Sequence, residues 1–232
     1  FWDKFNEISE SCNNNHSIYQ KDFFLYQREY CLSNNTLIED KTFIILNDSK
    51  VECAGIFFLT KGIDNKDLEL NFGSNFPGLI LIHDDFNNNS INLLKEIIIS
   101  LLKKSKKIIF TTPTNCNFNK GYQSILNSFK FIQNINWIKS IPTHQDEKTL
   151  WKNIRKSYKS PINKGLKEQS FLLIDKSNLD YKKFKLIKEL HLKISGRKTR
   201  SDKSWDLQYS SIKNDNGFAF ISFEKEKSNL NS

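Results

Sequence analysis

Seven consecutive residues, Ser195 to Ser201, bring two guanidinium groups, one ammonium group, three hydroxyls and a glycine into one short stretch. Helical patterns at 181–194 and 205–213 predict that 195–203 is a loop between two helices. Such a loop can bind phosphate through side-chain forks, hydroxyls and the N-terminus of the following helix. A solvated surface loop is the equally weighted alternative. The candidate ligand-binding residues here are Ser195, Gly196, Arg197, Thr199 and Arg200.

His191 precedes this loop on the predicted helix, with Ile187 and Ile194 beside it at helical spacing. A histidine at this place could act as a general base. The commoner alternative is a structural histidine packed against the loop.

A second basic segment, 147–159, is predicted to be a helix that Asp146 caps. Arg155 and Lys159 stand four residues apart and therefore share a helix face. Arg155, Lys156 and Lys159 are candidate ligand-binding residues, although a solvated face is the favoured interpretation of this helix taken by itself. Pro161 should break or kink the helix and start a second helical piece near 162–168.

The net charge of +9 lies entirely in the last part of the chain. Residues 1–140 contain 15 basic and 15 acidic residues, whereas 141–232 contain 20 and 11. Only four of the 35 basic residues are arginines, and three of these four lie in the two basic segments. Arginine offers a planar fork that matches phosphate or carboxylate, so this placement predicts an anionic partner.

Several classes of protein are disfavoured. No apolar run approaches the ~18 residues of a membrane span, and the N-terminus shows no secretory signal. The four cysteines are widely spaced without a C-x-x-C pair, which predicts a reduced cytoplasmic protein without a zinc site. His83-Asp84-Asp85 is interpreted as a loop and not as a metal site, and no nucleophilic triad is evident. We expect no metal and no permanently bound cofactor.

Strands alternate with helices along the chain, which predicts an α/β fold with a mixed sheet. Helices are expected at 1–11, 19–31, 90–104 (capped by Ser90), 120–128, 146–159, 181–194 and 205–213. Strands are expected at 42–46, 51–60, 79–82, 108–111, 129–141, 171–174 and 218–223. The turn-forming residues 47–50 predict a hairpin between the first two strands. The predicted boundary between two units lies near 141–143.

The two basic segments also carry a resemblance to a family. DEKTLWKNIRKSYKSPINKG, and HLKISGRKTRSDKSWDLQ followed by GFAFISF, resemble the second half of FemAB-type acyltransferases, a branch of the GNAT-like fold. The resemblance implies two GNAT-like units, 1–141 and 142–232. Because methionine is absent and the chain stops soon after 217–223, we expect a piece of a longer protein with an incomplete second unit.

The resemblance also implies a function, namely transfer of an acyl or aminoacyl group to an amine. The donor would be acyl-CoA or aminoacyl-tRNA, and the amine acceptor could be nucleotide- or lipid-linked, in peptidoglycan, cell-envelope or surface-glycan assembly. Arg155, Lys156, Arg197 and Arg200 would bind phosphates, and Trp205 would wall the acyl or acceptor pocket. The chain departs from acetyl-CoA-dependent GNAT enzymes in lacking an Arg/Gln-x-x-Gly-x-Gly/Ala loop.

Two other functions fit the same residues. A tRNA- or nucleic-acid-binding module without chemistry would use the basic patch, with Tyr158 and Trp205 as stacking surfaces. A catalytically idle scaffold would keep the fold for protein contacts alone.

Overall fold

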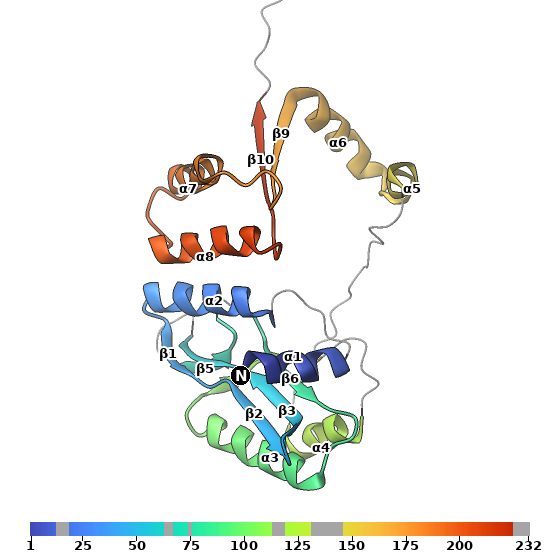
Figure 1. The fold of residues 1–232 in the computed structure, drawn as a ribbon, viewed down its shortest axis with the longest axis vertical. Coiled ribbons are helices and arrows are strands. Elements are labelled where there is room, and N and C mark those ends of the chain that lie inside the picture. Colours follow the sequence, from blue (N-terminus) through green and yellow to red (C-terminus); the bar gives the residue numbers. More distant parts are fainter. Residues whose placement is uncertain (13–18, 63–66, 74–75, 113–118, 131–145, 225–232) are drawn as a thin grey trace, which may run out of the picture.

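The computed structural model describes residues 1–12, 19–62, 67–73, 76–112, 119–130 and 146–224. These residues form a mixed α/β structure in which helices flank mixed sheets (Figure 1). The helices are α1 (Trp2–Ser11), α2 (Lys21–Ser33), α3 (Asn88–Leu102), α4 (Lys120–Ser128), α5 (Glu147–Asn153), α6 (Lys156–Glu168), α7 (Tyr181–Ser195) and α8 (Asp202–Lys213). The strands are β1 (Leu37–Asp40), β2 (Phe43–Asn47), β3 (Lys50–Ile56), β4 (Phe58–Lys61), β5 (Leu68–Asn71), β6 (Gly78–Ile82), β7 (Lys107–Ile108), β8 (Phe110–Thr111), β9 (Gln169–Ile174) and β10 (Ala219–Glu224).

The predicted hairpin at 47–50 is confirmed. Asn47 pairs with Lys50 at the end of the antiparallel β2–β3 ladder. Asp48 and Ser49 between them have φ angles of 46° and 72°. Two positive φ angles are typical of the tight turns whose twist matches that of the strands they join.

Two four-stranded sheets make up the first half, in the orders β2-β3-β6-β8 and β1-β4-β5-β7. In both sheets the last pair of strands is parallel, β6 with β8 and β5 with β7, while the other neighbours are antiparallel. Helix α3 connects β6 to the strand pair β7 and β8. This connection explains the mixed sheet, because parallel neighbours need a crossover.

Successive side chains of β3 and β6 point to opposite faces and build two separate cores. Cys53, Ile80 and Ile82 pack with side chains of α3 and α4. Ala54 and Leu81 pack on the other face with side chains of α1 and α2. The β2-β3-β6-β8 sheet is therefore covered by helices on both faces.

The second half has a much smaller core. β9 and β10 form an antiparallel pair, and α7 packs against α8 through Phe184, Trp205 and Ile212. α8 also lies along α2 of the first half (Figure 1). Neither α5 nor α6 buries a side chain.

Some expected element boundaries were wrong. Asn87, and not Ser90, caps α3, because its side chain accepts a hydrogen bond from the Asn89 N–H. Asp146 caps α5 as expected. The break after α5 comes at Ile154 and Arg155, whose backbones are extended, and Pro161 lies inside α6.

Two strands, β1 and β5, were not anticipated at all. The α/β class with a mixed sheet is confirmed. The expected strand at 129–141 and the expected boundary at 141–143 fall largely or wholly outside the described residues, so they remain predictions. No helix in the described part of the chain is both long and apolar enough to span a membrane.

Candidate ligand site at the loop between α7 and α8

The loop after α7 is fixed at both of its ends. Gly196 ends α7 in the left-handed conformation (φ 65°), and its N–H donates to the Leu192 carbonyl. This conformation suits glycine, which has no Cβ to clash. Ser201 caps α8 by accepting a hydrogen bond from the Ser204 N–H at 3.1 Å. The basic side chains between these ends are thus held on a short, anchored segment.

His191 and the loop are directly connected. The Nε2 atom of His191 lies 2.8 Å from the Thr199 hydroxyl oxygen, and its ring meets the Trp205 ring edge-on at 5.4 Å. Burial lowers the pKa of His191 from its ordinary value, and the positive charge of Arg200 lowers it further. A lowered pKa favours the neutral imidazole, which is the form that a general base needs.

A hollow of about 210 Å³ opens beside this histidine. We call it the basic hollow, and it is lined by Lys188, His191, Leu192, Arg197, Lys198, Thr199, Arg200, Asp202 and Trp205. Four of these side chains are cationic and one is a carboxylate, so the lining has a formal charge of +3. A surface of this charge favours an anionic ligand.

Asp202 partly neutralises the basic hollow. Its carboxylate oxygens lie 2.6 Å from the Lys188 ammonium and 3.1 Å from the Lys198 ammonium. Asp202 also stands in the first turn of α8, whose N-terminus Ser201 already caps. An anion in the basic hollow would therefore be bound by the cationic side chains, above all by the exposed Arg197, and not by the N-terminus of α8.

Arg200 forms a wall between two hollows. Its guanidinium carbon lies 4.9 Å from the centre of the Trp205 ring and 5.9 Å from that of Tyr26. Its Nη1 donates to Gln208 Oε1 at 3.3 Å. Cation–π contacts and this hydrogen bond hold the guanidinium in a defined position. Arg200 is thus better suited to orienting a ligand than a freely moving surface lysine.

The second hollow, of about 320 Å³, lies on the other side of Arg200 and Trp205. We call it the apolar hollow, because apolar side chains provide most of its wall. Its lining comprises Asp22, Phe23, Tyr26, Phe184, Ile187, Arg200, Trp205, Leu207, Gln208, Ser211, Ile212, Gly217, Phe218 and Ala219. Three of these residues belong to α2 and were not anticipated, because nothing in the sequence near α2 indicates that α8 covers it.

The resemblance implied that Arg155 binds phosphate together with Arg197 and Arg200, but the two basic segments do not converge on one site. Arg155, Lys156 and Lys159 line neither hollow. α5 and the beginning of α6 lie to the right in Figure 1, whereas the loop between α7 and α8 lies at the left. Lys159 instead places its ammonium 5.8 Å from the centre of the Trp151 ring. The first basic segment therefore gives no support to a phosphate site shared with Arg197 and Arg200.

Ser195, Gly196, Thr199 and Trp205 all lie at the loop, but in different roles. The Ser195 hydroxyl donates to the Arg197 carbonyl at 2.8 Å and so shapes the loop. Gly196 supplies the helix end. Thr199 and Trp205 face the basic hollow. Thr199 holds the ring of His191, and Trp205 separates the two hollows.

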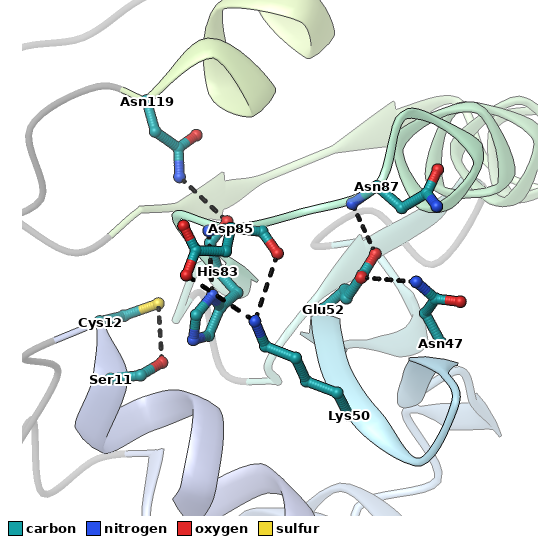
Figure 2. A network of polar contacts seen from close by, with 9 residues as sticks. All are labelled: Ser11, Cys12, Asn47, Lys50, Glu52, His83, Asp85, Asn87 and Asn119. Carbon is teal, nitrogen blue, oxygen red and sulfur yellow. Dashed lines mark hydrogen bonds and ion pairs between the residues drawn. The ribbon is translucent and has the colours of Figure 1, made fainter.

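A second polar cluster follows β6 (Figure 2). His83 Nδ1 accepts a hydrogen bond from the Asp85 N–H, and Lys50 forms an ion pair with the Asp85 side chain at 3.9 Å. Asn119 donates to the Ile82 carbonyl at 3.1 Å. These bonds join the ends of strands and helices. Within the described residues, no three His, Cys, Asp or Glu side chains are placed to hold a metal ion.

Comparisons with protein-family models, with curated proteins and with solved structures found no match to this chain. Any functional conclusion therefore has to come from the residues of the site.

Proposed function

We propose that the chain is an N-acyltransferase of the FemAB or GNAT-like kind, with the loop between α7 and α8 as part of its active site. The observation that carries this proposal is His191, held by Thr199 in the wall of a hollow whose lining has a formal charge of +3. A base beside an anion-binding surface suits the attack of an amine on an acyl group carried by a phosphate-bearing donor.

The proton would pass through His191. When Nε2–H donates to the Thr199 hydroxyl, the lone pair of Nδ1 is free to accept a proton. Within the described part of the chain, Nδ1 has no hydrogen-bond partner. The amine nitrogen attacks the acyl carbonyl carbon, and an amide bond forms. The thioester C–S bond, or the ester C–O bond of an aminoacyl-tRNA, breaks. The proton lost by the amine goes to Nδ1 and then to the leaving thiolate or alkoxide.

The two hollows would bind chemically different parts of the reactants. In this proposal Arg197 meets phosphate oxygens at the rim of the basic hollow, while Trp205 and the apolar hollow take the acyl group or an apolar part of the acceptor. Arg200, already fixed by Trp205 and Tyr26, orients the group that lies between them. Positioning of this kind supplies much of the rate in acyl transfer.

The test measures donor turnover directly. The protein is incubated with acetyl-CoA and a panel of small and nucleotide-linked amines, and free thiol is measured; aminoacyl-tRNA is tested in parallel by its deacylation. His191→Gln should lower kcat about 100-fold or more with little change in KM, because one proton-transfer group contributes about 10²–10⁴-fold. Arg197→Ala should mainly raise KM. The matched control is His83→Gln, which lies outside both hollows.

A module that binds nucleic acid without chemistry is the second candidate. It needs only the positive lining of the basic hollow, because the contacts of His191 with Thr199 and of Arg200 with Gln208 suit a structural role as well. Such a module would bind tRNA with an affinity that falls steeply with salt and would turn over no donor. Salt-dependent binding without any amine-dependent release of thiol or tRNA would decide for it.

A further inference from the structure

Helix α6 exposes an apolar stripe. Tyr158, Ile162 and Leu166 are 59%, 37% and 55% exposed, and no residue of α6 is buried. These three residues are spaced by four, so their side chains lie one above another on a single face. In Figure 1 α6 lies to the right of β9, while α7 and α8 lie to its left.

The opposite face of α6 is basic. Lys156, Lys164 and Lys167 point away from the stripe, as the angle of about 100° between successive residues requires. The basic character extends into α5. From Glu147 to Glu168 the chain has seven basic side chains and two acidic ones, which stand at the two ends of the segment, so the net charge is +5. The whole α5–α6 segment is therefore strongly positive and carries an apolar stripe.

A helix packed into a domain normally buries its apolar stripe against the core. A helix with an exposed apolar stripe, a lysine-rich opposite face and low overall hydrophobicity is typical of helices that lie in the surface of a bilayer. Lysines near such a surface are attracted to anionic headgroups. The positive charge of α6 and its exposed apolar stripe thus both fit the surface of a bilayer with anionic headgroups.

We propose that α6 binds the surface of a bilayer containing anionic phospholipid. The helix axis lies parallel to that surface. Tyr158, Ile162 and Leu166 enter the boundary between headgroups and acyl chains, and the lysines bend their long, flexible side chains back toward the bilayer to contact the headgroup phosphates. This inference uses no residue of the two hollows and does not depend on the proposed function.

Two other partners fit less well. Single-stranded nucleic acid binds by stacking its bases on aromatic rings, and two of the three stripe residues, Ile162 and Leu166, are aliphatic. A second copy of the chain would bring two strongly positive segments together, which repel each other. Anionic lipid provides both an apolar phase and negative charge.

The experiment measures co-sedimentation of the whole chain with vesicles of phosphatidylcholine, with and without about 30% phosphatidylserine. Ile162→Gln/Leu166→Gln should weaken binding to the anionic vesicles at least about tenfold, because it removes apolar contact with the bilayer. Leu186→Gln/Leu190→Gln on α7 is the matched control, since these leucines are 45% and 41% exposed. The control should bind as the unchanged chain does.

A second pair of variants tests the charge. Lys156→Gln/Lys164→Gln/Lys167→Gln should weaken binding on the order of 100-fold, about fivefold for each lysine. Lys182→Gln/Lys193→Gln/Lys213→Gln removes the same net charge from α7 and α8 and should weaken binding much less.

Three results would overturn the proposal. The first is equal binding to neutral and anionic vesicles, or to neither. The second is equal loss in the α6 variants and their controls. The third is an α6 stripe variant that leaves vesicle binding intact and instead abolishes self-association in sedimentation or binding of a single-stranded RNA probe.

Discussion

The Ser201 hydroxyl donates a hydrogen bond of 3.1 Å to the carboxylate of Glu29, 172 positions earlier in the sequence. The other carboxylate oxygen of Glu29 lies 3.1 Å from the Lys203 ammonium, and the Glu29 side chain is only 15% exposed. Ser201 also caps α8. One acidic residue of α2 thus fixes the point at which the basic loop ends and α8 begins.

Glu29→Ala should lower the free energy of unfolding by about 1–2 kcal/mol, because hydrogen bonds to charged groups contribute about 1.5–3 kcal/mol and part is regained by solvation. Urea denaturation measures this change. Glu96→Ala, an exposed position on α3, is the control and should change stability by less than about 0.5 kcal/mol. Equal effects of the two substitutions would argue against a role for Glu29 in joining α2 to α8.

The pKa of His191 should be below the ordinary value of 6.5 when measured by NMR titration. Arg200→Gln should raise it, since it removes the positive charge, but not to the full value, because burial is the larger cause. A folded-state pKa below the unfolded one means that the unfolded chain takes up the proton first. Stability should therefore fall as the pH drops through about 6.5, and His191→Gln should remove this contribution. A pKa at or above 6.5 would contradict the structure.

Glu52, one of the residues drawn in Figure 2, is buried. Its carboxylate accepts hydrogen bonds from the Asn47 side chain at 2.9 Å and from the Asn87 N–H at 2.7 Å. Burial by itself would raise the pKa of Glu52, but the hydrogen bonds outweigh it and leave the pKa lowered. Since Asn87 caps α3, Glu52 connects β3 to the beginning of that helix.

Glu52→Gln should cost roughly 2 kcal/mol at pH 7, because an amide cannot accept all the hydrogen bonds that the carboxylate accepts. With a lowered folded-state pKa, the contribution of Glu52 is complete above about pH 4.5 and is lost as the pH falls further. The urea concentration at the unfolding midpoint should therefore differ less between the unchanged chain and Glu52→Gln at acidic pH than at pH 7. Glu10→Gln, on the exposed side of α1, should show neither effect.

Two glycine substitutions should change the stability of the chain in opposite directions. A Cβ on Gly165, inside α6, would meet only the end of the Gln169 side chain at 3.9 Å, so Gly165→Ala should stabilise the chain by up to about 1 kcal/mol. A Cβ on Gly78 would lie 2.4 Å from the Phe57 ring and 2.8 Å from the Ile56 carbonyl, so Gly78→Ala should cost about 1–3 kcal/mol. Thermal unfolding of both variants checks the two signs together.

Local patterns in the sequence predicted most of the elements. The spacing of apolar residues in α3 and the turn formers at 47–50 depend on neighbouring residues alone, and both predictions are confirmed. β5 was missed because its four residues alternate polar and apolar side chains over too short a span. Pro161 was expected to break or kink the helix, but it lies inside α6. The break comes instead at Ile154 and Arg155, where the backbone is extended.

The candidate site was predictable only in part. Arg197, Thr199 and Arg200 stand together in the sequence, so their proximity followed from the chain itself. The contact of Arg200 with Tyr26 joins residues far apart in the chain, and no local pattern encodes it. The expectation that Arg155 lies near Arg197 was wrong. Two segments of like charge can lie anywhere on the surface, so their charge does not predict that they are close to each other.

The packing of α8 on α2 has a consequence for synthesis on the ribosome. One side of α2 belongs to the core of the first half, through Phe24 and Cys31, but Phe23 and Tyr26 line a hollow completed by α8. Translation of more than 170 further codons separates the emergence of α2 from that of α8. During that interval Phe23 already contacts Phe72 and Phe76, but the Tyr26 ring lacks the cover that α8 later provides, and we expect the nascent chain to be most vulnerable to proteases and aggregation then.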